Sequence, residues 1–219
     1  MNRFLKHDEP ALIWTGELVL DGRLTIPSAA SGLILMPGVG GTFQHEGVRA
    51  LAAHFHDNGF ATLIADLLTP DEQQFDARTR HFRTDLPLLA DRIVAVAEWL
   101  AKEGATCLLP VAFFGSGVVG SAALFAASAH TARFFAFTIT CPRLGLLYGV
   151  APHVKAPALL LIDETVSQVT TAGVLDGETR VESIASVTPL LESHAAMEEV
   201  TQKAIVWFRN HVPAMLTIA

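Results

Sequence analysis

Along the chain, apolar runs bounded by glycine or proline alternate with segments whose apolar residues recur at helical spacing. Residues 45–59 and 86–104 each place their apolar positions on one helical face and end in glycine, which predicts two amphipathic helices. A last helix is expected at about 193–210. The continuous apolar runs predict buried strands, which we expect at 32–38, 60–70, the start of 111–125, 133–142, 156–163 and 180–187.

The alternation of strands and helices predicts the arrangement of the elements. Strands that are separated by helices and short loops favour a mostly parallel central sheet with helices on both faces. ELVLDGRLTIP (17–27) predicts an antiparallel hairpin that turns at Asp21-Gly22 and lies at the edge of the sheet. The highly charged segment 71–85 is expected to be a surface excursion. Without a linker or a repeat, residues 1–219 are expected to form a single α/β domain with no separate lid domain.

Composition narrows the class of protein. A hydrophobic fraction of 51%, a charged fraction of 17% and a mean hydropathy of +0.40 fit a sheet of buried strands. No apolar run has the length of a membrane span, and MNRFLKHDEP lacks the apolar core of a secretory signal. With only Cys107 and Cys141, no disulfide framework is expected, so we predict a cytoplasmic location. A net charge of −7 without a basic block counts against nucleic acid as a partner.

The stretch VAFFGSGVVGSAALF (111–125) predicts a buried strand, a glycine turn and an apolar helix, an arrangement on which many hydrolases mount a nucleophile. A second glycine-rich loop follows an earlier strand in MPGVGGT (36–42). Its residues Gly38, Val39 and Gly40 suit an oxyanion-type loop of backbone N–H groups, with a plain strand-to-helix turn as the alternative. Phe43 interrupts any dinucleotide fingerprint. Neither a cofactor nor a metal is expected.

The order of elements, together with ATLIADLLTPDEQQFDARTRHFRTDLPLLADRI (61–93) and LPVAFFG…AALFAA (109–127), resembles the dienelactone-hydrolase-like branch of the α/β-hydrolases. More narrowly, the chain is similar to small hydrolases that are sometimes fused to phosphoribosyltransferases. The resemblance spans nearly the whole chain and is strongest between residues 60 and 127. It implies an α/β-hydrolase fold with a nucleophile, a histidine and an acid at three fixed positions.

The residues at these positions depart from the family pattern. When G-x-S-x-G is laid on the turn, Gly115 matches the first glycine, Gly117 occupies the nucleophile position and Val119 replaces the second glycine. The histidine position, in VTPLLE (187–192), holds Pro189, which can neither accept nor donate a proton. The resemblance therefore implies that the nucleophile and the general base are both missing.

Weaker alternatives lie nearby. Ser116 precedes the nucleophile position by one residue, and Cys141 ends a predicted strand close to the expected pocket. A buried apolar role is the more common one for such a cysteine. Asp163 and Glu164 supply carboxylates slightly before the acid position, and His194 follows the histidine position by five residues.

Three functions are compatible with this pattern. In the first, the chain is a pseudo-enzyme whose cleft binds a small molecule or a partner. The second is an ester or lactone hydrolase that uses Ser116 or Cys141 with His194, His153 or His81. A third is a structural role in an assembly of several copies of the chain. The candidate partners are thus a small-molecule ligand in the cleft and, for a homo-oligomer, other copies of this chain, with neither nucleic acid nor a membrane.

Overall fold

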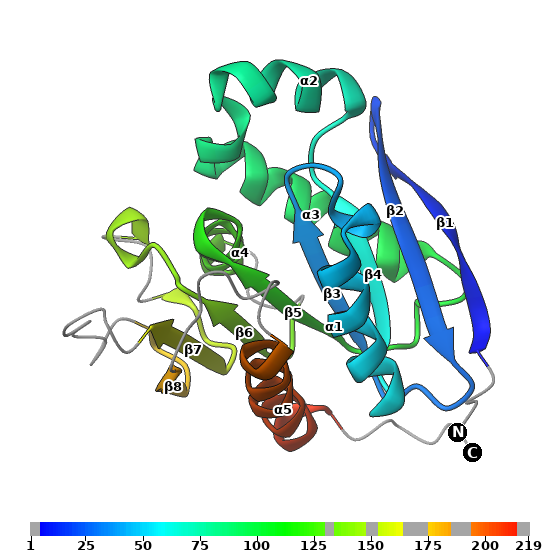
Figure 1. Ribbon diagram of the computed structural model, residues 1–219, viewed down its shortest axis with the longest axis vertical. Coiled ribbons are helices and arrows are strands. Elements are labelled where there is room, and N and C mark those ends of the chain that lie inside the picture. Colours follow the sequence, from blue (N-terminus) through cyan, green and yellow to red (C-terminus); the bar gives the residue numbers. More distant parts are fainter. Residues whose placement is uncertain (1–4, 130–133, 148–152, 164–174, 185–193, 214–219) are drawn as a thin grey trace.

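The structure is a computed structural model, and it describes residues 5–129, 134–147, 153–163, 175–184 and 194–213. Within these residues one sheet runs through the molecule in the order β1-β2-β4-β3-β5-β6-β7-β8 (Figure 1). Strands β1, β2 and β4 pair antiparallel, and every other neighbouring pair is parallel. The strands are β1 (Leu5–Thr15), β2 (Leu18–Pro27), β3 (Leu33–Gly38), β4 (Ala61–Asp66), β5 (Val111–Ser116), β6 (Phe137–Thr140), β7 (Ala158–Asp163) and β8 (Thr179–Ile184).

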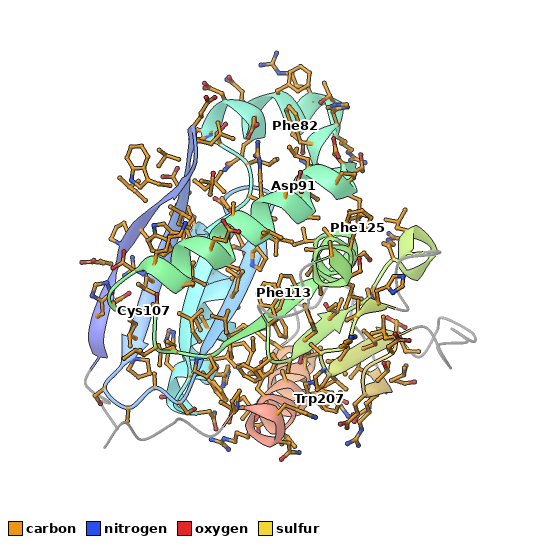
Figure 2. All side chains as sticks on the ribbon, turned by 180° about the vertical axis from the view of Figure 1, so that it is seen from behind. Phe82, Asp91, Cys107, Phe113, Phe125 and Trp207 are labelled. Atoms are coloured by element: carbon orange, nitrogen blue, oxygen red, sulfur yellow. The ribbon has the colours of Figure 1, made fainter. Side chains whose placement is uncertain are left out.

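Helices cover both faces of the sheet. In Figure 1, α1 and α5 lie in front of it, and Figure 2 shows α3 and α4 on the opposite face. Two apolar clusters fill the spaces between these layers, with Phe113 in the cluster under α3 and α4 and Phe114 in the other. No helix in the described ranges is long and apolar enough to cross a bilayer. The helices are α1 (Glu46–Asp57), α2 (Pro70–Thr79), α3 (Leu86–Lys102), α4 (Gly117–Ala129) and α5 (His194–His211), with short 3-10 turns η1 (Thr42–Gln44), η2 (Phe82–Thr84) and η3 (Leu144–Leu147).

The mostly parallel sheet, its two helical layers and the antiparallel hairpin at the edge confirm the predicted fold class. The predicted position of the hairpin turn, Asp21-Gly22, is wrong, however. The chain reverses at Gly16, whose φ is +78°, between β1 and β2. Gly22 lies inside β2 and pairs with Ala11 and Ala65. A Cβ on Gly22 would lie 2.8 Å from the Ile64 carbonyl oxygen, so this glycine permits close strand packing rather than a turn.

The charged segment after β4 contains a helix that its polarity concealed. Helix α2 begins with a capping box, in which the Thr69 hydroxyl accepts from the Glu72 N–H and the Glu72 carboxylate accepts from the Thr69 N–H. Asp76, fully buried, accepts hydrogen bonds from the backbone N–H and guanidinium of Arg83. Burial raises the pKa of Asp76, but these bonds outweigh it and hold the pKa below its ordinary value.

A buried arginine fastens α2 to the rest of the fold. Arg92, on α3, is 6% exposed and forms a bidentate pair with Glu72, with both N–O distances at 2.6 Å. The same guanidinium donates to the carbonyl of Leu67, the residue that directly follows β4. The hydrogen bonds that the Glu72 carboxylate accepts from Arg92 are the largest influence on its pKa and hold it below the ordinary value of 4.5. The pair therefore fixes α2 beyond the carboxyl end of β4.

This pair makes a prediction about stability. Because the pKa of Glu72 is lower in the folded chain, its stabilising effect is present above pH 4.5 and is lost as the pH falls through the folded value. We expect Glu72→Gln to lower the free energy of unfolding by about 2 kcal/mol at pH 7. Urea denaturation at a series of pH values should show this difference shrinking in acid.

The neighbouring Asp71→Asn is the matched control, because Asp71 is exposed and in the same helical turn. It should change the free energy of unfolding by no more than about 0.5 kcal/mol. Equal effects of the two variants, or a Glu72→Gln difference that does not change with pH, would contradict the assignment.

Candidate functional site

The turn between β5 and α4 has the geometry of a nucleophile elbow. The strand ends at Ser116 and the helix begins at the next residue, Gly117, whose φ is +54°. This left-handed conformation suits glycine and is strained for other residues. A Cβ added to Gly117 would meet no atom within 4 Å. The turn therefore has room for a side chain at its apex but carries none.

Close packing on both sides of the turn holds it in place. At Gly115, a Cβ would lie 2.7 Å from Cε1 of the fully buried Phe113. A Cβ on Gly120 would overlap Cγ2 of Ile139 on β6. The family pattern puts its second glycine at the position of Val119, but Val119 is buried in the core, and the close approach is made one residue later.

A buried hydroxyl links this turn to the next loop. Ser121 is fully buried on α4 and donates to the Gly117 carbonyl at 3.2 Å. The hydroxyl oxygen of Ser121 in turn accepts a hydrogen bond from the backbone N–H of Arg143 at 2.9 Å. Sequence reasoning missed Ser121, although a serine within an otherwise apolar helix was the available signal. Its hydroxyl positions the loop after β6 against the apex of the turn.

Ser116 and Cys141 lie at the ends of neighbouring strands. Ser116 is exposed and pairs with Thr140, the residue that precedes Cys141. Within the described part of the chain, no histidine forms a hydrogen bond with the Ser116 hydroxyl. Cys141 is half-buried, packs against the cluster under α1 and α5, and has a φ of +47°. That conformation is rare for a residue with a side chain and marks a locally constrained backbone.

The acid and histidine candidates are only partly placed. Asp163 is the half-buried last residue of β7, so β6 lies between it and Ser116. His194 is the first residue of α5. Pro189, Glu164 and the loops around them lie outside the described residues. Among the residues that are described, no group of three or more His, Cys, Asp or Glu side chains is arranged to hold a metal ion.

The glycine-rich loop lies beside the elbow, because β3 pairs with β5. Gly38 ends β3, and its lack of a Cβ gives room to Thr42. The carboxylate of Asp66, 2% exposed, accepts the Thr42 N–H at 2.8 Å. Gly40 has a φ of +146° and packs near Gln73 on α2, while Val39 is half-buried against the core. Asp66 thus fixes this loop, a role that sequence reasoning missed.

Comparison with known proteins identifies the family. No family model matches the chain. A solved structure, a dienelactone hydrolase from Anabaena variabilis, is 32% identical over 94% of this chain and 99% of its own, with a TM-score of 0.82. The chain belongs to the dienelactone hydrolase family of α/β-hydrolases. A dienelactone-hydrolase-like promiscuous phosphotriesterase from metagenomic libraries shares the fold, at 17% identity over 94% of this chain and 99% of its own, with a TM-score of 0.70.

Curated relatives in two strains of Mycobacterium tuberculosis are named as phosphoribosyl transferases. Each is 31% identical to the present chain over 211 residues, which is 94% of the present chain. The chain spans 47% of the length of these relatives. Their name therefore describes proteins that extend well beyond the matched region.

The packing at the turn yields a prediction that does not depend on catalysis. Gly120→Ala should lower the free energy of unfolding by about 2 kcal/mol, because the new methyl group overlaps Ile139 in a closely packed core. Urea denaturation would measure the change. Gly104→Ala is the matched control, since a Cβ at Gly104 meets nothing within 4 Å and should leave stability within about 0.5 kcal/mol. If the two variants had equal stability, Ile139 or α4 would have to shift at little cost to make room for the new methyl group at position 120.

Proposed function

We propose that this member of the dienelactone hydrolase family has lost triad hydrolysis and uses its cleft to bind a small molecule or a partner. The observation that carries the proposal is Gly117, at the apex of the elbow in a left-handed conformation with open space where a Cβ would project. A hydrolase of this type places its attacking oxygen or sulfur on that atom. Here the backbone geometry is retained without the reacting group.

A second substitution supports the same proposal. The family's histidine position holds Pro189, and a proline cannot take the proton of a nucleophile. The nucleophile and the base lie in separate segments of the chain, so their losses are two independent departures from the family pattern. In a triad the acid acts by orienting the histidine, so replacing the histidine position also removes the role of the acid position.

The glycine-rich loop supports retention of a binding cleft. Gly38 and Gly40 keep the loop after β3 beside the elbow, and the buried Asp66 fixes its backbone through Thr42. Such a loop suits an oxygen-bearing ligand, because backbone N–H groups stabilise negative charge on oxygen. The proposed ligand class is therefore a small molecule with a carbonyl or an anionic oxygen.

One observation favours a second candidate, an active ester or lactone hydrolase. Cys141 has a left-handed backbone conformation and follows the strand position paired with Ser116. Constrained backbone of this kind occurs often at functional sites. In this alternative the Cys141 thiol or the Ser116 hydroxyl gives its proton to His194, His153 or His81 and attacks the ester carbonyl. The C–O bond to the alcohol breaks, the alcohol leaves with that proton, and water then hydrolyses the acyl-enzyme to the acid.

The proposal predicts that a nucleophile alone does not restore activity. Gly117→Ser should hydrolyse p-nitrophenyl acetate no faster than the wild-type chain, because Pro189 leaves the new hydroxyl without a general base. Initial rates would measure this, with circular dichroism to verify folding, since serine at a left-handed φ costs about 1 kcal/mol. Clear esterase turnover by this variant would reveal a base in the cleft.

Ser116→Ala and Cys141→Ala separate the two candidates. If the wild-type chain shows no rate that either variant removes, the pseudo-enzyme proposal stands. A wild-type rate that disappears in one of them would identify the displaced nucleophile and overturn the proposal. Cys107→Ser is the control for the thiol variant, because Cys107 is exposed and lies outside the proposed site.

A further inference from the structure

A pocket lies away from the elbow, between α1 and the strands β1, β2 and β4. Its volume is about 450 Å³, which is within the range of small-molecule pockets. None of its described lining residues belongs to β5, α4 or β6. One wall is η1, where Phe43 directly follows the glycine-rich loop. The pocket is therefore separate from the elbow but shares a segment of chain with the loop beside it.

The charges in this pocket favour an anion. Asp8 is already neutralised, since it accepts from Arg23 at 2.9 Å and from Thr25 at 3.0 Å. Arg49, by contrast, has no side-chain hydrogen bond or ion pair within the described part of the chain. Together Arg23, Arg49 and Asp8 leave one excess positive charge in the pocket. A single anionic group on a ligand would balance it.

His56 lines the pocket as a neutral group. Its Nε2 lies 2.7 Å from the hydroxyl of the fully buried Thr62. Burial lowers the pKa of His56 below its usual 6.5, against the opposing influence of the Asp8 and Asp57 carboxylates. At neutral pH the imidazole therefore adds a polar group to the pocket without adding charge.

Apart from Gln44, the remaining lining side chains are apolar. Ala52 and Ile64 are buried members of the cluster under α1 and α5, and Phe43 packs against that cluster. Few polar groups against an apolar wall are typical of pockets that orient a small organic ligand. A free guanidinium with a planar fork matches the two oxygens of a carboxylate. The described surfaces thus suit an anionic head with an apolar body.

We propose that this pocket binds a small organic carboxylate, whose carboxylate pairs with Arg49 and whose apolar part lies against Phe43, Ala52 and Ile64. Binding here does not depend on the state of the elbow, because the two sites share no described side chain. The bound ligand would contact Phe43 in η1. Binding should therefore reduce the motion of the segment that directly follows the glycine-rich loop. The site is a second binding function beside the cleft.

Benzoate is the probe, and calorimetric titration of the full chain measures its binding, with the His56 imidazole resonance as a local reporter. Benzamide, its neutral analogue, should bind much more weakly because it cannot pair with Arg49. Arg49→Gln should weaken benzoate binding by about tenfold or more, as expected for a lost charge-assisted hydrogen bond. Arg49 is exposed on α1, so the variant should fold.

Arg78→Gln is the matched control, because it removes the same charge from an exposed helical position outside the pocket. It should leave benzoate binding and the His56 shift within about twofold of the wild type. An equal loss of benzoate affinity in Arg49→Gln and Arg78→Gln would show that benzoate is attracted only by the net charge of the protein, and it would overturn the proposal. No benzoate binding at millimolar concentration, binding unaffected by Arg49→Gln, or inorganic phosphate binding more tightly than benzoate would also overturn it.

Discussion

The contact between α4 and the strands beneath it is the constraint on which the site depends. Gly120 allows α4 to approach Ile139 on β6 without a side chain between them, and Gly115 gives room to the ring of Phe113 on its own strand, β5. With the helix held this close, the chain must reverse from strand to helix within one residue, and Gly117 takes a positive φ. Ser121 then ties this turn to the loop after β6. The apex conformation therefore follows from packing and needs no catalytic group.

That separation of backbone geometry from chemistry explains how a family fold persists when its nucleophile position holds glycine. The residues on either side of the elbow pack in the core, and this packing fixes the backbone conformation of the turn. In the family pattern, which puts the nucleophile at Gly117 and the histidine at Pro189, triad hydrolysis needs a reactive side chain at both positions as well. Packing therefore accounts for the glycines on either side of the apex and does not require a nucleophile at Gly117. Membership of the dienelactone hydrolase family thus identifies the architecture, and the site residues decide the activity.

Much of the fold could be predicted, because local patterns encode it. Apolar runs and helical spacing located the parallel strands and α1, α3 and α5 correctly. The hairpin turn was placed at Gly22 instead of Gly16, since a glycine can permit close strand packing as well as a turn. Helix α2 was missed because its segment is almost entirely polar, although its capping box at Thr69 and Glu72 is a local signal. Asp66 and Ser121 were missed for a different reason, because their hydrogen-bond partners are set by tertiary structure. The roles of Gly117 and Pro189 in the cleft stay predictions from the family pattern.

Peptide mass spectrometry after brief exposure to p-nitrophenyl acetate tests the central claim most directly, because it detects a covalent acyl intermediate even when turnover is slow. The account predicts that Ser116 and Cys141 are acylated no faster in the folded chain than in the urea-unfolded chain, where no active site exists. Stoichiometric acylation of either residue in the folded chain, absent after unfolding, would contradict it. That result would show an activated nucleophile at an elbow whose apex is glycine.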